Sequence, residues 1–186
     1  MSVLPIRVLG DPVLREETRP VDAFTPELQR LIDDMFETMH AAHGVGLAAP
    51  QVGRSERLTV MEVQGERFVL INPEIVEKEG SIKWEEGCLS IPELYGDVMR
   101  AARVRVHAVD REGHPFEVEG TELKGVCLQH EIDHLHGKLF IDHLSLLKRQ
   151  KLLAEWETEK RKYPGLIRIV VPGEDEEDET HVDEKL

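Results

Sequence analysis

TELKGVCLQHEIDHLHG, residues 121–137, predicts a helix that ends at Gly137. Distinctive side chains recur in this stretch at i, i+3, i+4, i+7 and i+11, a spacing that gathers them on one helix face. They are Leu123, Val126, Cys127, His130 and His134. Glycine often follows the last helical turn, because it adopts a left-handed backbone without strain. We therefore expect one helix face that carries two imidazoles beside several apolar groups.

The segment His130-Glu131-Ile132-Asp133-His134 is the strongest chemical signal in the chain. Two histidines four residues apart project from the same side of a helix, so both imidazoles can bind one metal ion. Glu131 is adjacent to the first histidine and can take a proton from a metal-bound water. The competing interpretation is a surface helix on which these residues occur by chance.

The third ligand distinguishes between classes of metal hydrolase. The metzincin pattern requires a histidine where this chain has Phe140, so that class is disfavoured. A thermolysin-like zinc endopeptidase takes a downstream glutamate, and Glu155 and Glu157 are available. Cys88, in the segment EGCLS at 86–90, is another candidate, because a thiolate with two imidazoles leaves a fourth position for water. A buried structural thiol is the alternative for Cys88, and the residues alone leave both interpretations open.

The segment GVGLAAPQ, residues 44–51, predicts a tight loop, because it is small, apolar and interrupted by glycine and proline. Gly44 and Gly46 permit an unusual backbone, and the Gln51 amide can donate a hydrogen bond to an oxyanion. An ordinary glycine-rich turn is the alternative. Nucleotide binding is disfavoured, because the segment lacks the GK[ST] ending of a phosphate loop.

Capping residues and apolar periodicity predict two further helices. Thr25 and Pro26 begin one that Gly44 ends, and Ser145 begins another that Pro164 stops. Both helices carry leucines at helical spacing.

Residues 57–119 are predicted to be β-structure, because short segments rich in Val and Ile alternate with turn residues. The clearest strands are 57–63, 68–71 and 104–109. The expected breaks are Pro73, Gly80, Gly96 and the stretch REGHP at 111–115. Residues 166–171 can add an edge strand. The order helix, strands, helix, helix favours an α+β fold over an alternating parallel one.

The composition predicts a soluble protein of one domain. The chain has 186 residues, enough to bury a core, and its two cysteines cannot supply a disulfide framework. No apolar run approaches the roughly 20 residues that a bilayer-spanning helix needs. No signal peptide is recognisable either, so we expect a cytoplasmic protein with no membrane partner.

The net charge of −14 is divided unevenly along the chain. The segment from Gly173 onward, GEDEEDETHVDEKL, has eight acidic residues and one lysine and contributes −7. Because it holds too few apolar residues to fold, we expect a single catalytic domain over residues 1–172 and an acidic, disordered tail over 173–186. The acidic balance disfavours DNA or other nucleic acid as the principal ligand, since phosphate binding requires a basic face.

Taken together and in this order, GVGLAAPQ, EGCLS and HEIDH resemble the signature of peptide deformylases. The segments GDPVLR at 10–15 and GKLFID at 137–142 extend the resemblance over residues 5–150. It implies an α+β fold in which antiparallel and mixed β-sheets pack around a central metal-binding helix, with an N-terminal and a C-terminal helix. It also implies a metal-dependent hydrolase that removes the formyl group from the N-terminal formylmethionine of newly synthesised proteins and releases formate. An HExxH zinc endopeptidase is the alternative.

The resemblance implies a role for each residue that matches the metal-binding motifs. Cys88, His130 and His134 would bind one divalent metal ion, natively Fe²⁺, with Zn²⁺, Ni²⁺ or Co²⁺ as substitutes. Glu131 would transfer the proton between the attacking water and the leaving amine.

The resemblance also implies how the N-formylmethionyl peptide is held. The Gln51 amide and the Leu89 backbone N–H would hold the oxyanion, and Gly46 would contact the peptide backbone. The methionine side chain would enter an apolar pocket. The residues that match pocket positions are Val45, Leu123, Val126 and Cys127.

Charged residues outside the motifs are expected to support them or to bind a partner. We expect Glu86 and Arg100 to form an ion pair beside Cys88, and Asp133 to make a structural hydrogen bond. In bacterial relatives the C-terminal helix helps dock the enzyme on the ribosome, and the basic character of the matching helix supports the same hypothesis here. An ordinary solvated helix is the alternative. The basic residues are Lys148, Arg149, Lys151, Lys160, Arg161 and Lys162.

Overall fold

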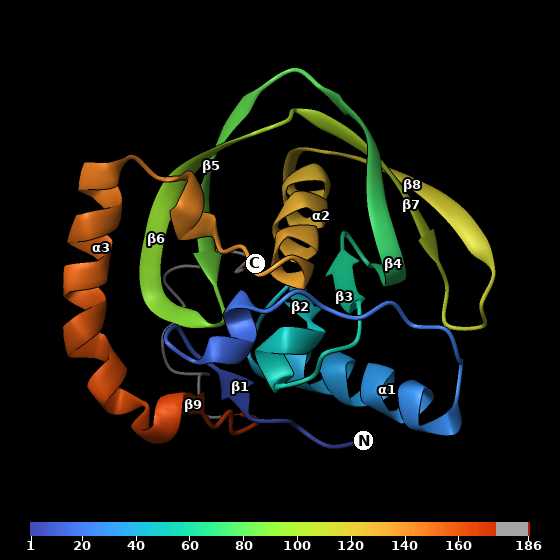
Figure 1. Ribbon diagram of the computed structural model, residues 1–186, viewed down its shortest axis with the longest axis horizontal. Helices are drawn as coiled ribbons and strands as arrows, with labels where there is room; N and C mark the ends of the chain where they lie inside the picture. Colours follow the sequence, from blue (N-terminus) through green and yellow to red (C-terminus); the bar gives the residue numbers. More distant parts are fainter. Residues whose placement is uncertain (174–185) are drawn as a thin grey trace.

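The computed structural model, which describes residues 1–173 and 186, places one helix at the centre of the protein with β-structure on both sides. This helix is α2, and it lies between the β5–β6 hairpin and a five-stranded sheet (Figure 1). Two other helices lie outside. The helices are α1 (Pro26–Ala41), α2 (Glu122–Leu135) and α3 (Leu146–Glu159).

All the paired strands are antiparallel within the described residues. The five-stranded sheet has the order β2-β3-β4-β7-β8, while β5 pairs with β6 and the short β1 with β9. The strands of the large sheet are β2 (Gly46–Ala48), β3 (Leu58–Val63), β4 (Glu66–Glu79), β7 (Arg103–Val109) and β8 (Pro115–Thr121). The others are β5 (Ile82–Cys88), β6 (Ile91–Arg100), β1 (Ile6–Arg7) and β9 (Ile167–Arg168). The predicted α+β class is therefore confirmed.

Helix α2 is buried around most of its circumference, as expected for a helix at the centre of a fold. Ten of its 14 residues are buried, among them Gln129, His130, Glu131 and His134. Its end is fixed by two hydrogen bonds, from Gly137 N to His134 O and from Lys138 N to Asp133 O. This paired pattern with a left-handed glycine is the Schellman motif. Gly137 therefore ends the helix as predicted.

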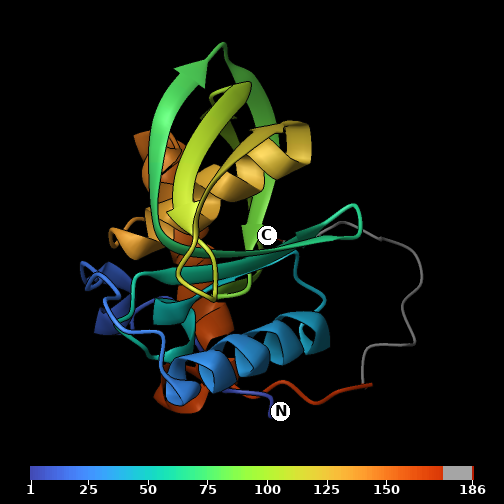
Figure 2. The same cartoon turned by 90° about the vertical axis from the view of Figure 1, so that its right-hand side faces the viewer.

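Helix α1 has the predicted cap and the predicted apolar stripe. The Thr25 hydroxyl accepts a hydrogen bond from Leu28 N, and Pro26 occupies the first helical position, where its missing N–H costs nothing. The stripe packs against β2 and β3. Figure 2 shows α1 and α2 on opposite sides of the β3–β4 strands, so the two helices enclose this part of the sheet.

The prediction of a tight loop at 44–51 was wrong. Gly46–Ala48 form strand β2, which pairs with β3, and Ala49–Val52 form a short 3-10 turn. Glycine and alanine disfavour strands locally, but here the backbone pairs with β3 and the small side chains are fully buried. Tertiary contacts therefore override the local preference.

Two predicted strand breaks were also wrong. Pro73 lies inside β4, at a register shift between Ile71 and Glu74, where the pairing with β7 is interrupted and no N–H is needed. Gly96 lies inside β6, where a Cβ would come within 2.9 Å of a Leu144 methyl group. Glycine at 96 thus permits close packing of η3 (Phe140–His143) and the residue that follows it against β6.

The C-terminal part agrees in outline with the sequence. Helix α3 begins after Ser145, whose hydroxyl accepts from Lys148 N, and only Ile167–Arg168 of the predicted edge strand pair with β1. The expected disorder of the acidic tail concerns residues 174–185, which lie outside the described residues. Leu186 is described and is buried. Among the described residues, no helix has the length and apolar character needed to cross a bilayer.

We predict that Gly137→Ala destabilises the protein more than Gly165→Ala. Both glycines have a φ of +68°, so alanine at either position incurs the left-handed penalty of about 1–2 kcal/mol. A Cβ at 137 would also lie 2.5 Å from the Arg15 carbonyl oxygen, whereas a Cβ at 165 meets nothing within 4 Å. The total loss at 137 should reach about 2–5 kcal/mol. Urea denaturation measures both values, and equal losses would contradict this account.

Candidate metal centre

Three potential metal ligands converge beside α2. Cys88 ends strand β5, and His130 and His134 lie one turn apart on α2. The Cys88 Sγ–His134 Nε2 distance is 3.4 Å and the Nε2–Nε2 distance between the histidines is 3.2 Å. All three side chains are buried, and their ligand atoms lie within 4.8 Å of one another. The described residues contain no other such group of three.

These distances fit a tetrahedral metal ion. Metal–nitrogen and metal–sulfur bonds of ordinary length place two imidazole nitrogens about 3.3 Å apart and a sulfur about 3.6 Å from a nitrogen. The imidazole orientation fits as well, because His130 Nδ1 lies 2.8 Å from a Glu86 oxygen and donates its hydrogen there. Nε2 of His130 is thereby the ring nitrogen available to a metal, and it is directed toward His134 Nε2.

Glu86 belongs to a buried network of charges. Arg100 donates to both Glu86 oxygens, at 2.7 and 2.8 Å, and to Asp133 at 2.7 Å. His143 Nε2 lies 2.7 Å from the same Asp133 oxygen. The predicted Glu86–Arg100 ion pair and the structural role of Asp133 are both present. Burial alone would raise the pKa of Glu86, but Arg100 and His130 outweigh it and hold the pKa below its ordinary value.

The two histidines differ in their affinity for protons when no metal is bound. Burial alone would lower the pKa of His130, but hydrogen bonds to Cys88 and Glu86 outweigh burial and raise it to about 10. Burial and the charge on His130 hold the pKa of His134 well below its usual range. A metal ion must therefore displace a proton from His130, whereas His134 is already neutral.

Glu131 follows His130 in the sequence, but its carboxylate contacts a different residue from the Glu86 that holds His130. Its Oε2 lies 3.3 Å from the Thr59 hydroxyl, while its Oε1 is buried and has no hydrogen-bond partner among the described residues. Burial raises the pKa of Glu131 to about 7. A Cβ on residue 46 would lie 2.6 Å from Oε1, so only glycine leaves the carboxylate its present place.

Gln51 and Leu89 lie next to Cys88. The Gln51 amide nitrogen is 3.6 Å from Cys88 Sγ and donates to the Ser90 hydroxyl at 3.1 Å, while its oxygen accepts from Ala48 N at 2.9 Å. The amide is thus held with its N–H groups toward the ligands. Leu89 follows Cys88 in the turn between β5 and β6.

The four residues assigned to an apolar pocket lie in one cluster. Val126 and Cys127 are fully buried, and Val45 and Leu123 pack against the same group. The cluster also contains strand residues such as Met61 and Leu70. Because Val126 and Cys127 lie on α2, the apolar cluster and the two candidate histidine ligands share one helix.

Comparison with known proteins identifies the family. The family described as polypeptide deformylase matches residues 3–150. The chain belongs to the polypeptide deformylase family. A curated peptide deformylase from Alkalilimnicola ehrlichii is 51% identical over 172 residues, covering 90% of this chain and 93% of the relative.

Solved structures agree with the family assignment. A peptide deformylase from Legionella pneumophila superposes with a TM-score of 0.84 at 50% identity, covering 87% of this chain and 97% of that one. The peptide deformylase from Thermus thermophilus gives 0.81 at 46% identity, covering 86% and 96%. The chain is therefore a metal-dependent deformylase that removes the formyl group from nascent peptides.

The zinc endopeptidase alternative is not favoured. It requires a glutamate beside the histidines, but Glu155 and Glu157 lie on α3, which packs against β6. Neither glutamate belongs to the group of potential ligands found among the described residues. In that group Cys88 is the third ligand beside the two histidines.

Three polar residues near the deformylase site escaped the sequence analysis. Thr59 reaches Glu131, Ser90 accepts from Gln51, and His143 completes the Asp133 network. Thr59 is a fully buried polar residue in strand β3, between Leu58 and Val60. Ser90 belongs to the EGCLS motif but has no chemistry of its own to distinguish it. Contact between His143 and Asp133 depends on the turn after Gly137.

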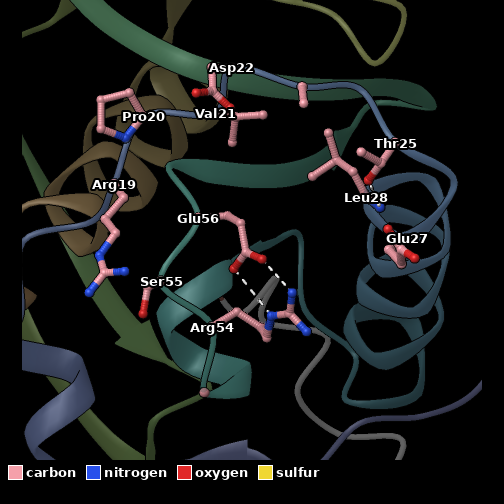
Figure 3. Close-up of a pocket in the computed structure, with 12 residues that line it drawn as sticks. Arg19, Pro20, Val21, Asp22, Thr25, Glu27, Leu28, Arg54, Ser55 and Glu56 are labelled. Atoms are coloured by element: carbon pink, nitrogen blue, oxygen red, sulfur yellow. Dashed lines mark hydrogen bonds and ion pairs between the residues drawn. The ribbon is translucent and has the colours of Figure 1, made fainter.

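One well-defined cavity lies away from these ligands. It has a volume of about 570 Å³ and opens to solvent between the start of α1 and the turn before β3 (Figure 3). Arg54 and Glu56, which line it, are paired with each other. None of its lining residues is a metal ligand, Glu131 or a member of the apolar pocket. This cavity is therefore separate from the candidate metal centre.

We predict that Arg100→Leu destabilises the metal-free deformylase by about 3–5 kcal/mol, because it leaves the buried Glu86 carboxylate without its cation. Arg30→Leu is the matched control. Arg30 is exposed, and its ion pair with Glu27 is long at 4.0 Å and also exposed. Its loss should therefore change the unfolding free energy by less than about 0.5 kcal/mol. Urea denaturation in a chelator measures both. A small loss at Arg100 would show that Glu86 finds another partner or becomes protonated.

Proposed function

We propose that Cys88, His130 and His134 hold one divalent metal ion and that Glu131 moves the proton during deformylation. The main support is geometric, because the three ligand atoms have tetrahedral spacing and a buried carboxylate lies next to them. The unpartnered Oε1 of Glu131 adds to it, since most buried polar atoms have a hydrogen-bond partner.

A divalent ion held by these ligands would supply Lewis acidity and lower the pKa of a bound water toward neutrality. We propose Fe²⁺ as the native ion, following the family resemblance. A thiolate with two imidazoles also suits Zn²⁺, Ni²⁺ and Co²⁺.

We assign the proton transfers to Glu131. Its carboxylate takes a proton from the attacking water, and the carboxylic acid then returns that proton to the amine nitrogen as the C–N bond breaks. The products are formate and a free amino terminus. The Gln51 amide and the Leu89 N–H are proposed to stabilise the negative charge on the former formyl oxygen.

The peptide is proposed to bind along β2. This strand is at one edge of the sheet order, and an extended peptide can add to such an edge through backbone hydrogen bonds. Gly46 on this strand adjoins Glu131, so a peptide bound there passes close to the base. The methionine side chain is assigned to the pocket formed by Val45, Leu123, Val126 and Cys127.

We propose a cytoplasmic enzyme that acts near the ribosome. Cys88 and Cys127 are not joined by a disulfide, which suits a reducing compartment. Docking is assigned to α3, where Leu146 and Leu147 are exposed next to Lys148 and Arg149. The cations after α3 contribute less, because Lys160 and Lys162 form ion pairs within the same segment. Residues 1–172 are taken as one catalytic domain.

We predict that Glu131→Gln lowers formate release from formyl-Met-Ala-Ser by about 10²–10⁴-fold while metal content stays unchanged. The amide has the shape of the carboxylate but cannot accept the proton. Glu27→Gln, the same change at an exposed position on α1, should leave the rate unaltered. Activity retained in Glu131→Gln would remove Glu131 from the mechanism.

The same assignment predicts the acidic limb of the pH profile. The base works as a carboxylate, and burial raises its pKa to about 7 in the metal-free chain. A bound cation nearby lowers that pKa. The kcat/KM of the loaded enzyme should therefore fall as pH decreases through a value at or below 7. An increase in kcat/KM toward lower pH would contradict this role.

We predict that Cys88→Ser weakens metal binding by more than the roughly 10–100-fold that loss of an outer partner costs. Cys127→Ser is the matched control for metal content, because Cys127 is also a buried thiol but lies outside the ligand group. Metal analysis after dialysis against a chelator measures both. Full metal retention in Cys88→Ser would favour the endopeptidase-type ligand set instead.

A further inference from the structure

Leu186 lies in the protein interior although it is the last residue of the sequence. Only 2% of its surface is exposed, and it belongs to the same apolar cluster as Val126 and Cys127. Both views of the fold place the C mark next to α2 (Figures 1 and 2). The side chain of Leu186 is thus buried against residues that lie more than fifty positions earlier in the sequence.

This cluster contains the pocket assigned above to the methionine side chain. Val45 and Leu123 pack against the buried members that include Leu186. Leucine and methionine have similar volumes and exchange for one another in apolar sites at little cost. A pocket that accepts a methionine side chain therefore also accepts a leucine.

We propose that Leu186 binds in the methionine pocket of its own chain and competes there with N-formylmethionyl peptides. The proposal rests on the proposed function, which assigns that pocket to the substrate. Its basis is the burial of Leu186 in the same cluster as the pocket residues.

The covalent connection permits this contact within one molecule. Thirteen residue steps from Gly173 to Leu186 span at most about 45 Å. A ligand on a short tether reaches an effective concentration on the order of mM at its site. A single apolar side chain binds weakly as a separate molecule. Attached to the chain, it can occupy the pocket in a large fraction of the protein molecules.

The kinetic consequence is a raised KM. Only the fraction of molecules with an open pocket can bind substrate, so the apparent KM increases in inverse proportion to that fraction. If Leu186 occupies the pocket in nine of ten molecules, the increase is about tenfold. The chemical step is unaffected, because a bound substrate has already displaced Leu186.

The first test is the KM for formyl-Met-Ala-Ser of the full metal-loaded chain with Leu186→Asp. A carboxylate is strongly disfavoured in an apolar pocket, so KM should fall about threefold to tenfold with kcat unchanged. Ile169→Asp makes the same chemical change at an exposed position outside the cluster and should leave both parameters unaltered. An unchanged KM in Leu186→Asp would overturn the proposal.

The second test does not depend on activity. In the zinc-loaded chain with labelled leucine and valine methyl groups, the Leu186 methyls are assigned by their loss in Leu186→Ala. They should show nuclear Overhauser effects to Val126, and the product Met-Ala-Ser should abolish these effects. Leu186 methyl shifts typical of exposed leucine would overturn the proposal.

Comparing the two tests separates the possible failures. If no form of the chain releases formate while Leu186 still contacts Val126, the proposed function fails and the pocket contact remains. If the wild type is active but Leu186→Asp has the same KM, the competition fails and the proposed function remains. A Leu186→Asp effect that disappears on dilution would show that the pocket takes Leu186 from a second copy, which would overturn the intramolecular proposal.

Discussion

The guanidinium of Arg100 holds together the polar groups that this fold places in its interior. It donates to both oxygens of Glu86 on β5 and to Asp133 on α2, and so connects β6 to both elements. Glu86 in turn fixes the ring of His130. A buried charge without such partners is strongly disfavoured, so each of these groups depends on the others. Arg100 therefore sets the position of His130 through Glu86, although a guanidinium is not itself a metal ligand.

The parts of the site that share one helix could be predicted from the sequence. His130, Glu131 and His134 have fixed relative positions once α2 forms, because helix geometry alone relates residues at such spacing. The contribution of Cys88 depends on the pairing of β5 with β6 and on the packing of that hairpin against α2. Spacing along the chain contains no such information, so Cys88 was assigned through its resemblance to known motifs. The Glu86–Arg100 pair followed from opposite charges near the same motif.

Non-local pairing explains what the sequence did not predict. Gly46, Leu47 and Ala48 have no local preference for a strand, and their extended backbone is fixed by hydrogen bonds to β3. The same pairing places Gly46 beside Glu131, a contact between positions 85 residues apart in the sequence. His143 was missed for a similar reason, because its contact with Asp133 depends on how the chain turns after Gly137. Local preferences predicted the helices and the β-structure of residues 57–119, whereas the close approaches that build the site depend on tertiary packing.

Two buried polar atoms at the candidate metal centre have no hydrogen-bond partner among the described residues. They are Glu131 Oε1 and His134 Nδ1. Each buried atom of this kind destabilises the fold by about 1–3 kcal/mol when nothing binds it. The neighbouring Glu86, Arg100 and Asp133 are paired with one another and do not add to this cost. A better-solvated Glu131 would destabilise the fold less, but it would lose the raised pKa of about 7 that suits the proton transfers proposed for it. The paired network around Arg100 thus stabilises the helix on which Glu131 Oε1 has no partner, and an oxygen left without a partner is available for the proton transfer proposed for it.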